Sequence, residues 1–181
     1  IVSIGNGRLV KLAEAVTPAT ARCRPTQEMQ KVSTPGKKTC ADVAQLLGTN
    51  LDKFVKSIAL VHEAENGGEV DFHLLLVRGD HDLNEIKVTK LPGLSPFRFA
   101  TEAEIRQFMG CEPGYIGPVE VGNNVRIIAD RTVASMSNFV CGANDAGHHV
   151  TGVYWGRDLS EPGQVADIRN VVSGDPSPDG K

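Results

Sequence analysis

Apolar side chains recur with helical spacing in two short segments of the chain. Residues 39–47 place them at positions i, i+3, i+4 and i+7, namely Cys40, Val43, Ala44 and Leu47. Thr39 precedes this segment and Gly48 follows it, and these residue types begin and end helices. Residues 101–109 open with Thr-Glu-Ala-Glu, the pattern of a capping box. Both segments are therefore predicted to be short amphipathic helices.

Other segments carry apolar runs of strand length or weaker helical patterns. The predicted strands are residues 57–61, 70–77, 125–129 and 150–155, and the sequence Glu-Asn-Gly-Gly at 65–68 predicts a hairpin turn. Further helices are expected at 9–16, 83–91 and 165–172, and a short one begins at Asn50, carries Phe54 and ends near Lys56. Helices and strands alternate without a strict βαβ repeat. The pattern thus predicts an α+β (or mixed α/β) fold with a sheet partly covered by helices.

The distribution of proline, glycine and small polar residues suggests the domain boundaries. Residues 1–36 have little apolar periodicity, and 17–25 are typical of a linker. Residues 173–180 hold two prolines and two glycines. We therefore expect an N-terminal segment and linker at 1–36, a folded body at 37–171 and an exit strap at 172–181.

Composition narrows the class of protein. The chain has 181 residues, of which 40% are hydrophobic and 23% charged, as in one globular domain. No apolar run approaches the roughly 20 residues of a membrane span, and no signal segment opens the chain, so we expect a cytoplasmic protein that contacts no membrane. The net charge of −3 argues against a broad basic surface that binds nucleic acid. It does not exclude a site that binds a few nucleotides.

The four cysteines are widely spaced at positions 23, 40, 111 and 141. None forms the close pair that a zinc site or a redox motif requires. We therefore predict four reduced thiols and no metal site.

Three places in the sequence carry candidate chemistry, and each also has an ordinary structural explanation. Residues 114–118 read Gly-Tyr-Ile-Gly-Pro, so the loop is either a surface turn or a nest of N–H groups that binds an anion. Lys56 either extends into solvent or holds a phosphate or ribose. Asp130 follows a predicted strand, where an aspartate either caps the next turn or takes part in catalysis.

His148 and His149 are adjacent at the start of a predicted strand. Since side chains alternate across a sheet, only one of the two faces a given site, and a paired-histidine metal site is not expected. The chain has no nucleophile elbow, phosphate loop or His-Glu-x-x-His motif. These patterns alone indicate no more than a mixed α and β domain.

Several segments together resemble one family. They are residues 78–87, 99–105, 114–118, 130–134, 139–144, 152–158 and 165–180. From about Thr26 to Gly180 the chain is similar to the insertion domain of bacterial-type prolyl-tRNA synthetases, in the superfamily of the free-standing YbaK-like aminoacyl-tRNA deacylases. The resemblance implies the YbaK-like fold, with a mixed, largely antiparallel sheet.

The resemblance implies an editing function in translation fidelity. In this family the domain hydrolyses the ester of alanine mischarged on tRNA(Pro), so the expected partners are the 3′ end of that tRNA and the remainder of a homodimeric synthetase. No cofactor is implied for editing. ATP and magnesium belong to a synthetic site outside this chain, which is therefore not expected to aminoacylate. The alternatives are a non-catalytic module that binds the tRNA end or stabilises the synthetase, and a free-standing deacylase.

The resemblance also implies the site residues. The family's catalytic positions fall on Lys56, His149, Gly114, Gly117, Pro118 and Asp130, and its amino-acid pocket falls on Cys40, Val43 and Phe54. Two positions depart from the family pattern. Phe54 replaces a common threonine, and Cys40 stands where a larger aliphatic residue occurs.

The mechanism expected for these residues relies on positioning, because an aminoacyl ester is already activated. On this hypothesis, N–H groups of the 114–118 loop polarise the ester carbonyl or orient a water molecule. Lys56 holds the terminal adenosine, His149 positions the ester, and the substrate's ribose hydroxyl assists the water. The backbone of the loop is then expected to matter more than the side chain of Tyr115.

Overall fold

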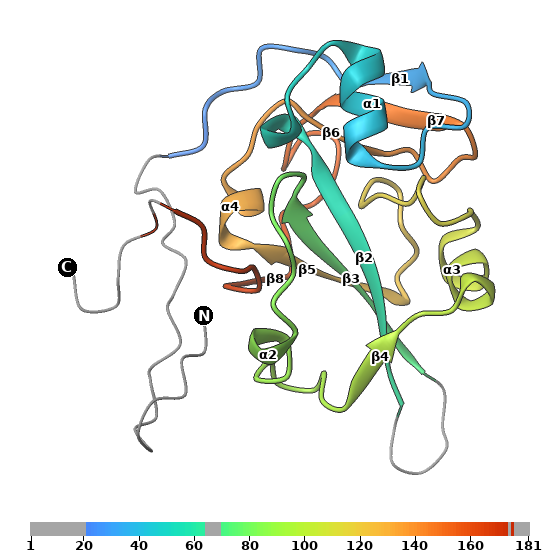
Figure 1. Cartoon of the computed structure of the whole chain (residues 1–181), viewed down its shortest axis with the longest axis vertical. Coiled ribbons are helices and arrows are strands. Elements are labelled where there is room, and N and C mark those ends of the chain that lie inside the picture. The colour runs from blue at the N-terminus through green and yellow to red at the C-terminus, as the bar shows by residue number, and fades with distance from the viewer. Residues whose placement is uncertain (1–20, 64–69, 174, 176–181) are drawn as a thin grey trace.

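A mixed five-stranded sheet runs through the centre of the molecule (Figure 1). The computed structural model describes residues 21–63, 70–173 and 175. Strands lie in the order β4–β2–β3–β5–β8, with the bounds β2 Val55–His62, β3 Asp71–Arg78, β4 Phe97–Phe99, β5 Val125–Asp130 and β8 Gln164–Ala166. β2 pairs antiparallel with β3 and β4, whereas β5 lies parallel to β3 and β8. β3 is central because its run of apolar residues is buried on both faces.

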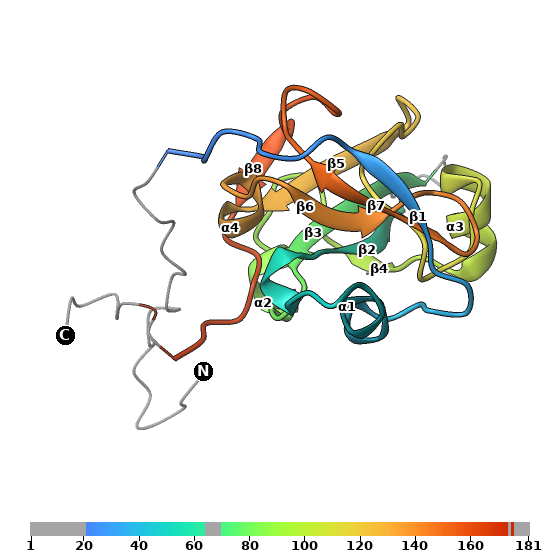
Figure 2. The ribbon, with the colours of Figure 1, turned by 90° about the horizontal axis from the view of Figure 1, so that it is seen from above.

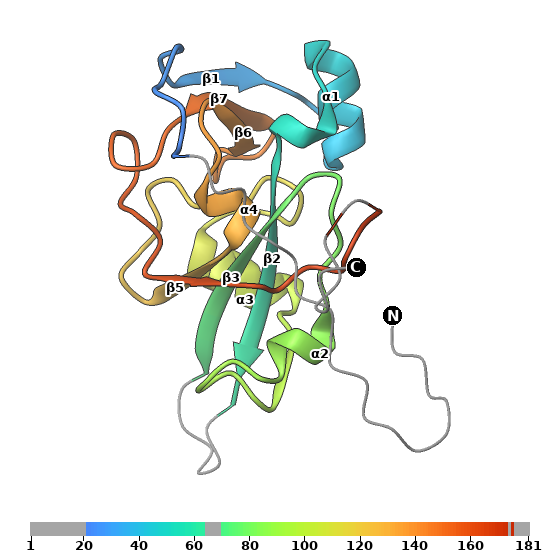
Figure 3. The ribbon, with the colours of Figure 1, turned by 90° about the vertical axis from the view of Figure 1, so that its left-hand side faces the viewer.

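A small antiparallel sheet lies at the end of the large sheet where β2 begins and β3 ends (Figures 1 and 3). Its strands are β1 Gln30–Ser33, β7 His148–Val153 and β6 Phe139–Gly142, in that order. One isolated β-bridge, between Phe54 and Val140, joins the small sheet to the residue just before β2. The start of β2 is thereby held beside β6.

The helices are short, and α1 and α3 begin and end at the residues expected from local sequence. They are α1 Cys40–Leu47, the 3₁₀ turn η1 Leu51–Lys53, α2 Glu85–Val88, α3 Glu102–Met109 and α4 Arg131–Ala134. Thr39 accepts a hydrogen bond from the N–H of Asp42, and Gly48 ends α1 in the left-handed conformation. Thr101 and Glu104 make both bonds of a capping box. The predicted helices at 39–47 and 101–109 are confirmed.

The large sheet separates two apolar clusters. One lies between its inner face, α3 and the small sheet, around Phe72, Leu74, Phe139 and Trp155. The other covers the opposite face around Leu60, Leu75 and Ile168. A third, smaller cluster of Val43, Ala44, Phe54 and Val140 packs under α1. Figure 2 looks onto the small sheet, with α1 to one side of it. The α+β class and the mixed, largely antiparallel sheet are confirmed.

The predicted helix at 165–172 is wrong. Residues 164–166 form the edge strand β8, and no helix follows within the described residues up to 173. The N–H of Ile168 donates to the carboxylate of Asp130, and the N–H of Asn170 donates to the carbonyl of Asp82. These bonds to other segments replace the i to i−4 bonds that a helix requires.

Other expectations need smaller corrections. The helix predicted at 83–91 is the single turn α2, and Phe54 follows η1 instead of lying within a helix. Residues 30–33, predicted to be loosely structured, form β1. No pattern in the sequence predicted β4, β6 or α4. The helix at 9–16, the turn at 65–68 and nearly all of the 172–181 strap lie outside the described residues.

Candidate functional site

A small cavity opens where the start of β2, the start of α1, the 114–118 loop and the small sheet meet. Its volume is about 70 Å³. That is roughly twice the share of liquid volume taken by one water molecule. The lining residues are Lys38, Cys40, Phe54, Val55, Lys56, Ser57, Gly114, Ile116, Cys141, Gly142 and His149. Of the residues predicted for the site, the cavity brings together Cys40, Phe54, Lys56, Gly114 and His149.

The two predicted pocket residues of α1 have different positions. Cys40 lines the cavity, and burial raises the pKa of its thiol. Val43 is fully buried and packs with Phe54 and Val140 in the cluster under α1. Val43 therefore supports the cavity wall from behind, while Cys40 and Phe54 form its surface.

Lys56 stands second in β2 and is partly exposed. Its Nζ lies 3.3 Å from Oδ1 of Asp82, and the side chains are 32% and 83% exposed. An ion pair so open to solvent contributes little to stability. The ammonium group can therefore exchange this partner for an anionic group of a ligand.

His149 is buried in β7 and held on two sides. Its Nδ1 lies 2.7 Å from the hydroxyl of Thr34, a fully buried residue just after β1. Its ring meets the ring of Tyr115 edge-on at 5.7 Å. Burial lowers the pKa of His149, so the imidazole is neutral at physiological pH.

The neighbouring His148 does not line this cavity. It is only partly buried, and its Nδ1 lies 3.0 Å from Asp145. The expectation that only one of the two histidines faces the site is confirmed. In the part of the chain that the structure describes, no group of three His, Cys, Asp or Glu side chains is placed to hold a metal ion.

The 114–118 loop packs backbone against backbone on β6. A Cβ atom at Gly117 would overlap the carbonyl oxygen of Gly142, and one at Gly142 would overlap the carbonyl oxygens of Tyr115 and Ile116. Gly114 has a φ of 95°, a conformation that favours glycine. Gly117 and Pro118 are buried behind the cavity and do not line it.

Asn144 holds this loop through its side chain. Its Oδ1 accepts the N–H of Gly117 at 2.8 Å, and its Nδ2 donates to the carbonyls of Gly117 and Val119. The N–H of Gly117 is therefore not available to a substrate. The N–H groups of Gly114 and Ile116 have no acceptor among the described residues, so these two are the loop donors available at the cavity.

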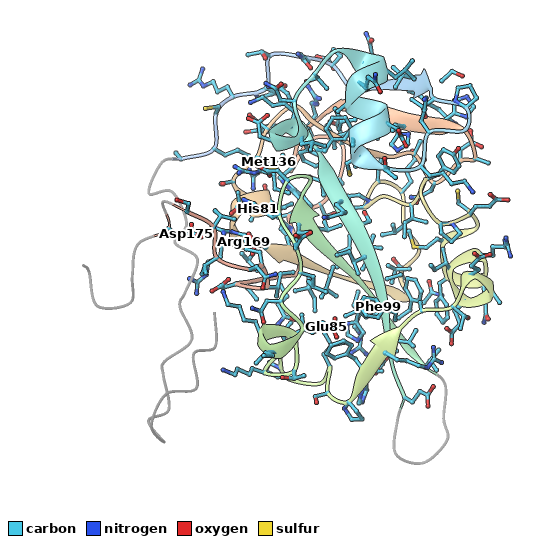
Figure 4. The ribbon with its side chains drawn as sticks, viewed as in Figure 1. His81, Glu85, Phe99, Met136, Arg169 and Asp175 are labelled. Carbon is cyan, nitrogen blue, oxygen red and sulfur yellow. The ribbon has the colours of Figure 1, made fainter. Side chains whose placement is uncertain are left out.

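Asp130 lies outside the cavity and is completely buried at the end of β5. Its carboxylate accepts the N–H groups of Thr132, at 2.9 Å, and Ile168, at 3.2 Å. It therefore caps α4, the structural role that the sequence had left open. Arg169 lies beside it, and Figure 4 shows Arg169, His81 and Asp175 at the side of the molecule where the C-terminal segment runs.

Sequence reasoning missed several residues of the site. Thr34 and Asn144 contact His149 and Gly117 across 115 and 27 positions of the chain, so no local pattern marks them. Cys141 and Gly142 lie in a segment that carried the family resemblance, which was the available signal. Ile116 lies in another such segment, residues 114–118, whereas Lys38 and Ser57 had no such signal.

Comparisons with known proteins identify the class of protein to which this chain belongs. A family model described as the aminoacyl-tRNA editing domain matches residues 34–159. The chain therefore belongs to the aminoacyl-tRNA editing domain family. None of the helices among the described residues is long and apolar enough to cross a membrane.

Within that family the chain is similar to part of the bacterial proline–tRNA ligases. It is 58% identical over 172 residues to the proline–tRNA ligase of Methylobacillus flagellatus, and 57% identical over 173 residues to that of Dechloromonas aromatica. Each alignment covers 95% of this chain and 30% of the relative. The chain thus spans about a third of the length of these relatives, and the resemblance to the editing domain of prolyl-tRNA synthetases is confirmed.

Solved structures give the same fold. A crystal structure of a putative trans-editing enzyme for prolyl tRNA synthetase matches with a TM-score of 0.64 and 26% identity, over 79% of this chain and 87% of that one. A crystal structure of a hypothetical protein matches with a TM-score of 0.63 at 24% identity, over 79% of this chain and 92% of that one.

Proposed function

We propose that this domain hydrolyses the ester bond of alanyl-tRNA(Pro) and releases alanine and free tRNA. The observation that carries the proposal is the 70 Å³ cavity, where Lys56, His149 and the Gly114 backbone meet in a member of the editing family. The 3′ end of the tRNA is the proposed partner. The remainder of a homodimeric synthetase is the proposed context, consistent with the 30% coverage of the ligases.

The size of the cavity favours a small amino acid. Cys40, Phe54 and Ile116 form its apolar walls. A volume near 70 Å³ suits a methyl side chain, whereas the pyrrolidine ring of proline is larger and meets these walls. Steric exclusion of this kind discriminates more strongly than a pocket that merely binds one extra methylene better.

Lys56 is suited to hold the terminal adenosine by its phosphate or ribose. Its side chain is about one-third exposed beside the cavity, and the side chain of its partner Asp82 is mostly in solvent. A phosphate is a stronger acceptor for this ammonium than an exposed carboxylate that it meets at 3.3 Å.

The ester carbonyl is proposed to lie against the N–H groups of Gly114 and Ile116. Donors fixed by the backbone stabilise the oxyanion without rearranging during the reaction. Neutral His149, held by Thr34, positions the ester. Gly117 and Pro118 act as positioning residues behind the cavity, whereas Asp130 acts on the fold by capping α4, since none of the three lines the cavity. Water assisted by the ribose hydroxyl is the nucleophile, and no cofactor is required for an ester that is already activated.

The test is release of alanine from alanyl-tRNA(Pro) by the purified domain, with prolyl-tRNA(Pro) as the substrate that must be spared. Lys56→Ala should lower kcat/KM about 10- to 100-fold, the value of one hydrogen bond between charged groups. The matched control is Lys53→Ala, which removes a more exposed lysine outside the cavity and should leave the rate unchanged.

Two results would contradict the proposal. A wild-type domain that binds the charged tRNA but releases no alanine is a binding module, the non-catalytic alternative. Wild-type turnover by a folded Lys56→Ala variant would remove Lys56 from the mechanism. The melting temperature of each variant separates lost chemistry from lost folding.

A further inference from the structure

Ser57 is a lining residue of the cavity that carries a buried hydroxyl. It follows Lys56 in β2. Its Oγ is inaccessible to solvent and has no hydrogen-bond partner among the described residues. Other buried polar atoms without a partner belong to Asp52, His73, His81 and Arg169, none of which lines this cavity.

The fold gains nothing from this hydroxyl. Burying an OH group without a partner costs stability, because the bonds it made to water are not replaced. The side chains on either side of Ser57 along the same face of β2, those of Val55 and Ala59, belong to the main apolar cluster. An alanine at position 57 would satisfy that packing without the polar group. The structure therefore leaves this hydroxyl without a protein partner at a residue that lines the cavity.

The side chains that line the cavity include few hydrogen-bond acceptors. No aspartate or glutamate is among its described lining residues, and Lys38 and Lys56 only donate. Burial raises the pKa values of Cys40 and Cys141, so both thiols stay protonated. Nδ1 of His149 is already bonded to Thr34.

An aminoacyl ester brings its α-amino group into such a cavity, and this group needs an acceptor. The loop N–H groups and Lys56 suit the carbonyl and the phosphate or ribose, since all of them are donors. Ser57 supplies a hydroxyl oxygen at a point shielded from water, whereas Lys56 is partly exposed. An amino acid that enters with its side chain and amino group first would meet Ser57 while its ester stays near the loop.

We propose that Oγ of Ser57 accepts a hydrogen bond from the α-amino group of the bound aminoacyl ester. The assignment rests on the proposed function. It makes Ser57 a substrate-binding residue that recognises the amino group, beside the apolar walls of the cavity that select the amino-acid side chain by size. It predicts that the domain distinguishes an α-amino acid ester from an ester of the same shape without nitrogen.

The test is a double-mutant cycle in which one change removes the hydroxyl of Ser57 and the other removes the amino group of the substrate. Wild type and Ser57→Ala are compared on tRNA(Pro) carrying alanine and on the same tRNA carrying propionate, which lacks the amino group. Ser57→Ala should lower kcat/KM for the alanyl ester about tenfold, the value of one hydrogen bond, and leave the propionyl ester unchanged. The different intrinsic reactivities of the two esters cancel in the cycle.

Two further measurements complete the experiment. Ser57→Thr keeps a hydroxyl on a residue that suits a strand, and it should restore the preference for the alanyl ester. The melting temperature of Ser57→Ala should equal or exceed that of wild type, because the variant buries no unpartnered hydroxyl.

Equal losses on both esters would overturn the assignment, and so would a Ser57→Ala variant with unchanged kcat/KM for the alanyl ester. A lowered melting temperature with equal losses would show that Ser57 is structural. If wild type releases neither alanine nor propionate, the proposed function itself fails. That result is distinct from an active enzyme whose cycle shows no coupling.

Discussion

Cys40 and Val43 lie one turn apart on α1, yet they have different roles at the residue scale. Cys40 touches the cavity, whereas Val43 is fully buried against Phe54 and Val140. Helical spacing places the two side chains on one face but does not say which of them reaches the surface of a pocket. On the proposed function, Cys40 therefore acts in selection of the amino acid, whereas Val43 stabilises the packing of the helix.

Cys40→Ala should relax the selection. Removing the sulfur enlarges the cavity of about 70 Å³ from which we propose that the proline ring is excluded, so hydrolysis of prolyl-tRNA(Pro) should rise about 10- to 200-fold. Val43→Ala should instead lower the stability by about 2 kcal/mol through lost packing and leave the selection intact. Deacylation of both charged tRNAs and urea unfolding measure the two effects. A folded Cys40→Ala domain that still spares proline would move the size limit to Phe54.

At the scale of the element, the 114–118 loop is held by β6 and by the segment that follows it. Asn144 bonds both the N–H and the carbonyl of Gly117, and the backbones of Gly117 and Gly142 are in direct contact. Tyr115 is buried and packs on His149. Its side chain therefore packs beside the cavity, and the expectation that the loop backbone matters more than this side chain stays a prediction.

Gly117→Ala should reduce deacylation about 100- to 1000-fold, as expected when an oxyanion donor is displaced. The new methyl group would overlap the Gly142 carbonyl, so the loop must move and carry the Gly114 and Ile116 N–H groups with it. Gly163→Ala is the matched control, because nothing lies within 4 Å of a Cβ there. Steady-state rates and melting temperatures check the pair, and a fully active Gly117→Ala domain would show that the loop is only a turn.

A buried ion pair ties α2 to the segment after β8. Lys87 and Asp167 are 8% and 9% exposed, and Nζ of Lys87 lies 2.8 Å from the carboxylate and 3.0 Å from the carbonyl oxygen of Arg169. Removing one member leaves a buried charge without its counterion, whereas removing both leaves an apolar contact. The effect on stability is therefore expected to be non-additive.

Lys87→Met should destabilise the domain by about 3–5 kcal/mol, and the double variant Lys87→Met with Asp167→Leu should recover most of the loss. Urea unfolding measures both. Arg106→Ala serves as the comparison, since it breaks the exposed pair with Glu102 and should cost less than about 1 kcal/mol. Additive losses from the two single substitutions would show that the pair is not coupled.

These elements also show which features the sequence predicts. The helices at 39–47 and 101–109 were predictable because Thr39, Gly48 and the Thr101 capping box act within one turn. Residues 165–172 have an equally helical pattern, but their backbone bonds go to Asp82 and Asp130. Local periodicity contains no information about such partners. In the site, the family resemblance supplied Lys56 and His149, whereas Ser57 required the structure.

At the scale of the whole molecule, three buried histidines lie in separate places. His73 is in β3, His81 follows the turn after β3, and His149 is in β7. Burial lowers the pKa of each below its usual 6.5, and nearby arginines lower the pKa values of His73 and His81 further. Arg78 donates to Nε2 of His81 at 2.9 Å, a bond that requires the neutral ring.

The sign of the pH dependence follows from these shifts. Below pH 6.5 the unfolded chain takes up protons on these histidines while the folded protein does not, so stability falls as the pH falls towards the folded-state pKa values. Each histidine contributes at most about 1.4 kcal/mol per pH unit. Glu104 and Asp175, whose pKa values are lowered to about 2, lose their contribution only at more acidic pH, below about 4.5. The interval between pH 4.5 and 6.5 therefore reports mainly on the histidines.

The urea midpoint should thus decrease from pH 6.5 to pH 5 and change little from pH 7.5 to 6.5. His73 is the sharpest test, because neither of its ring nitrogens has a hydrogen-bond partner among the described residues and it does not line the cavity. His73→Leu should be more stable than wild type at pH 5 and should show a shallower pH dependence. Because its loss removes no bond, the effect isolates the cost of charging a buried ring. If His73→Leu shows the same dependence of stability on pH as wild type, the acid sensitivity comes from His81 and His149, whose neutral rings bond Arg78 and Thr34.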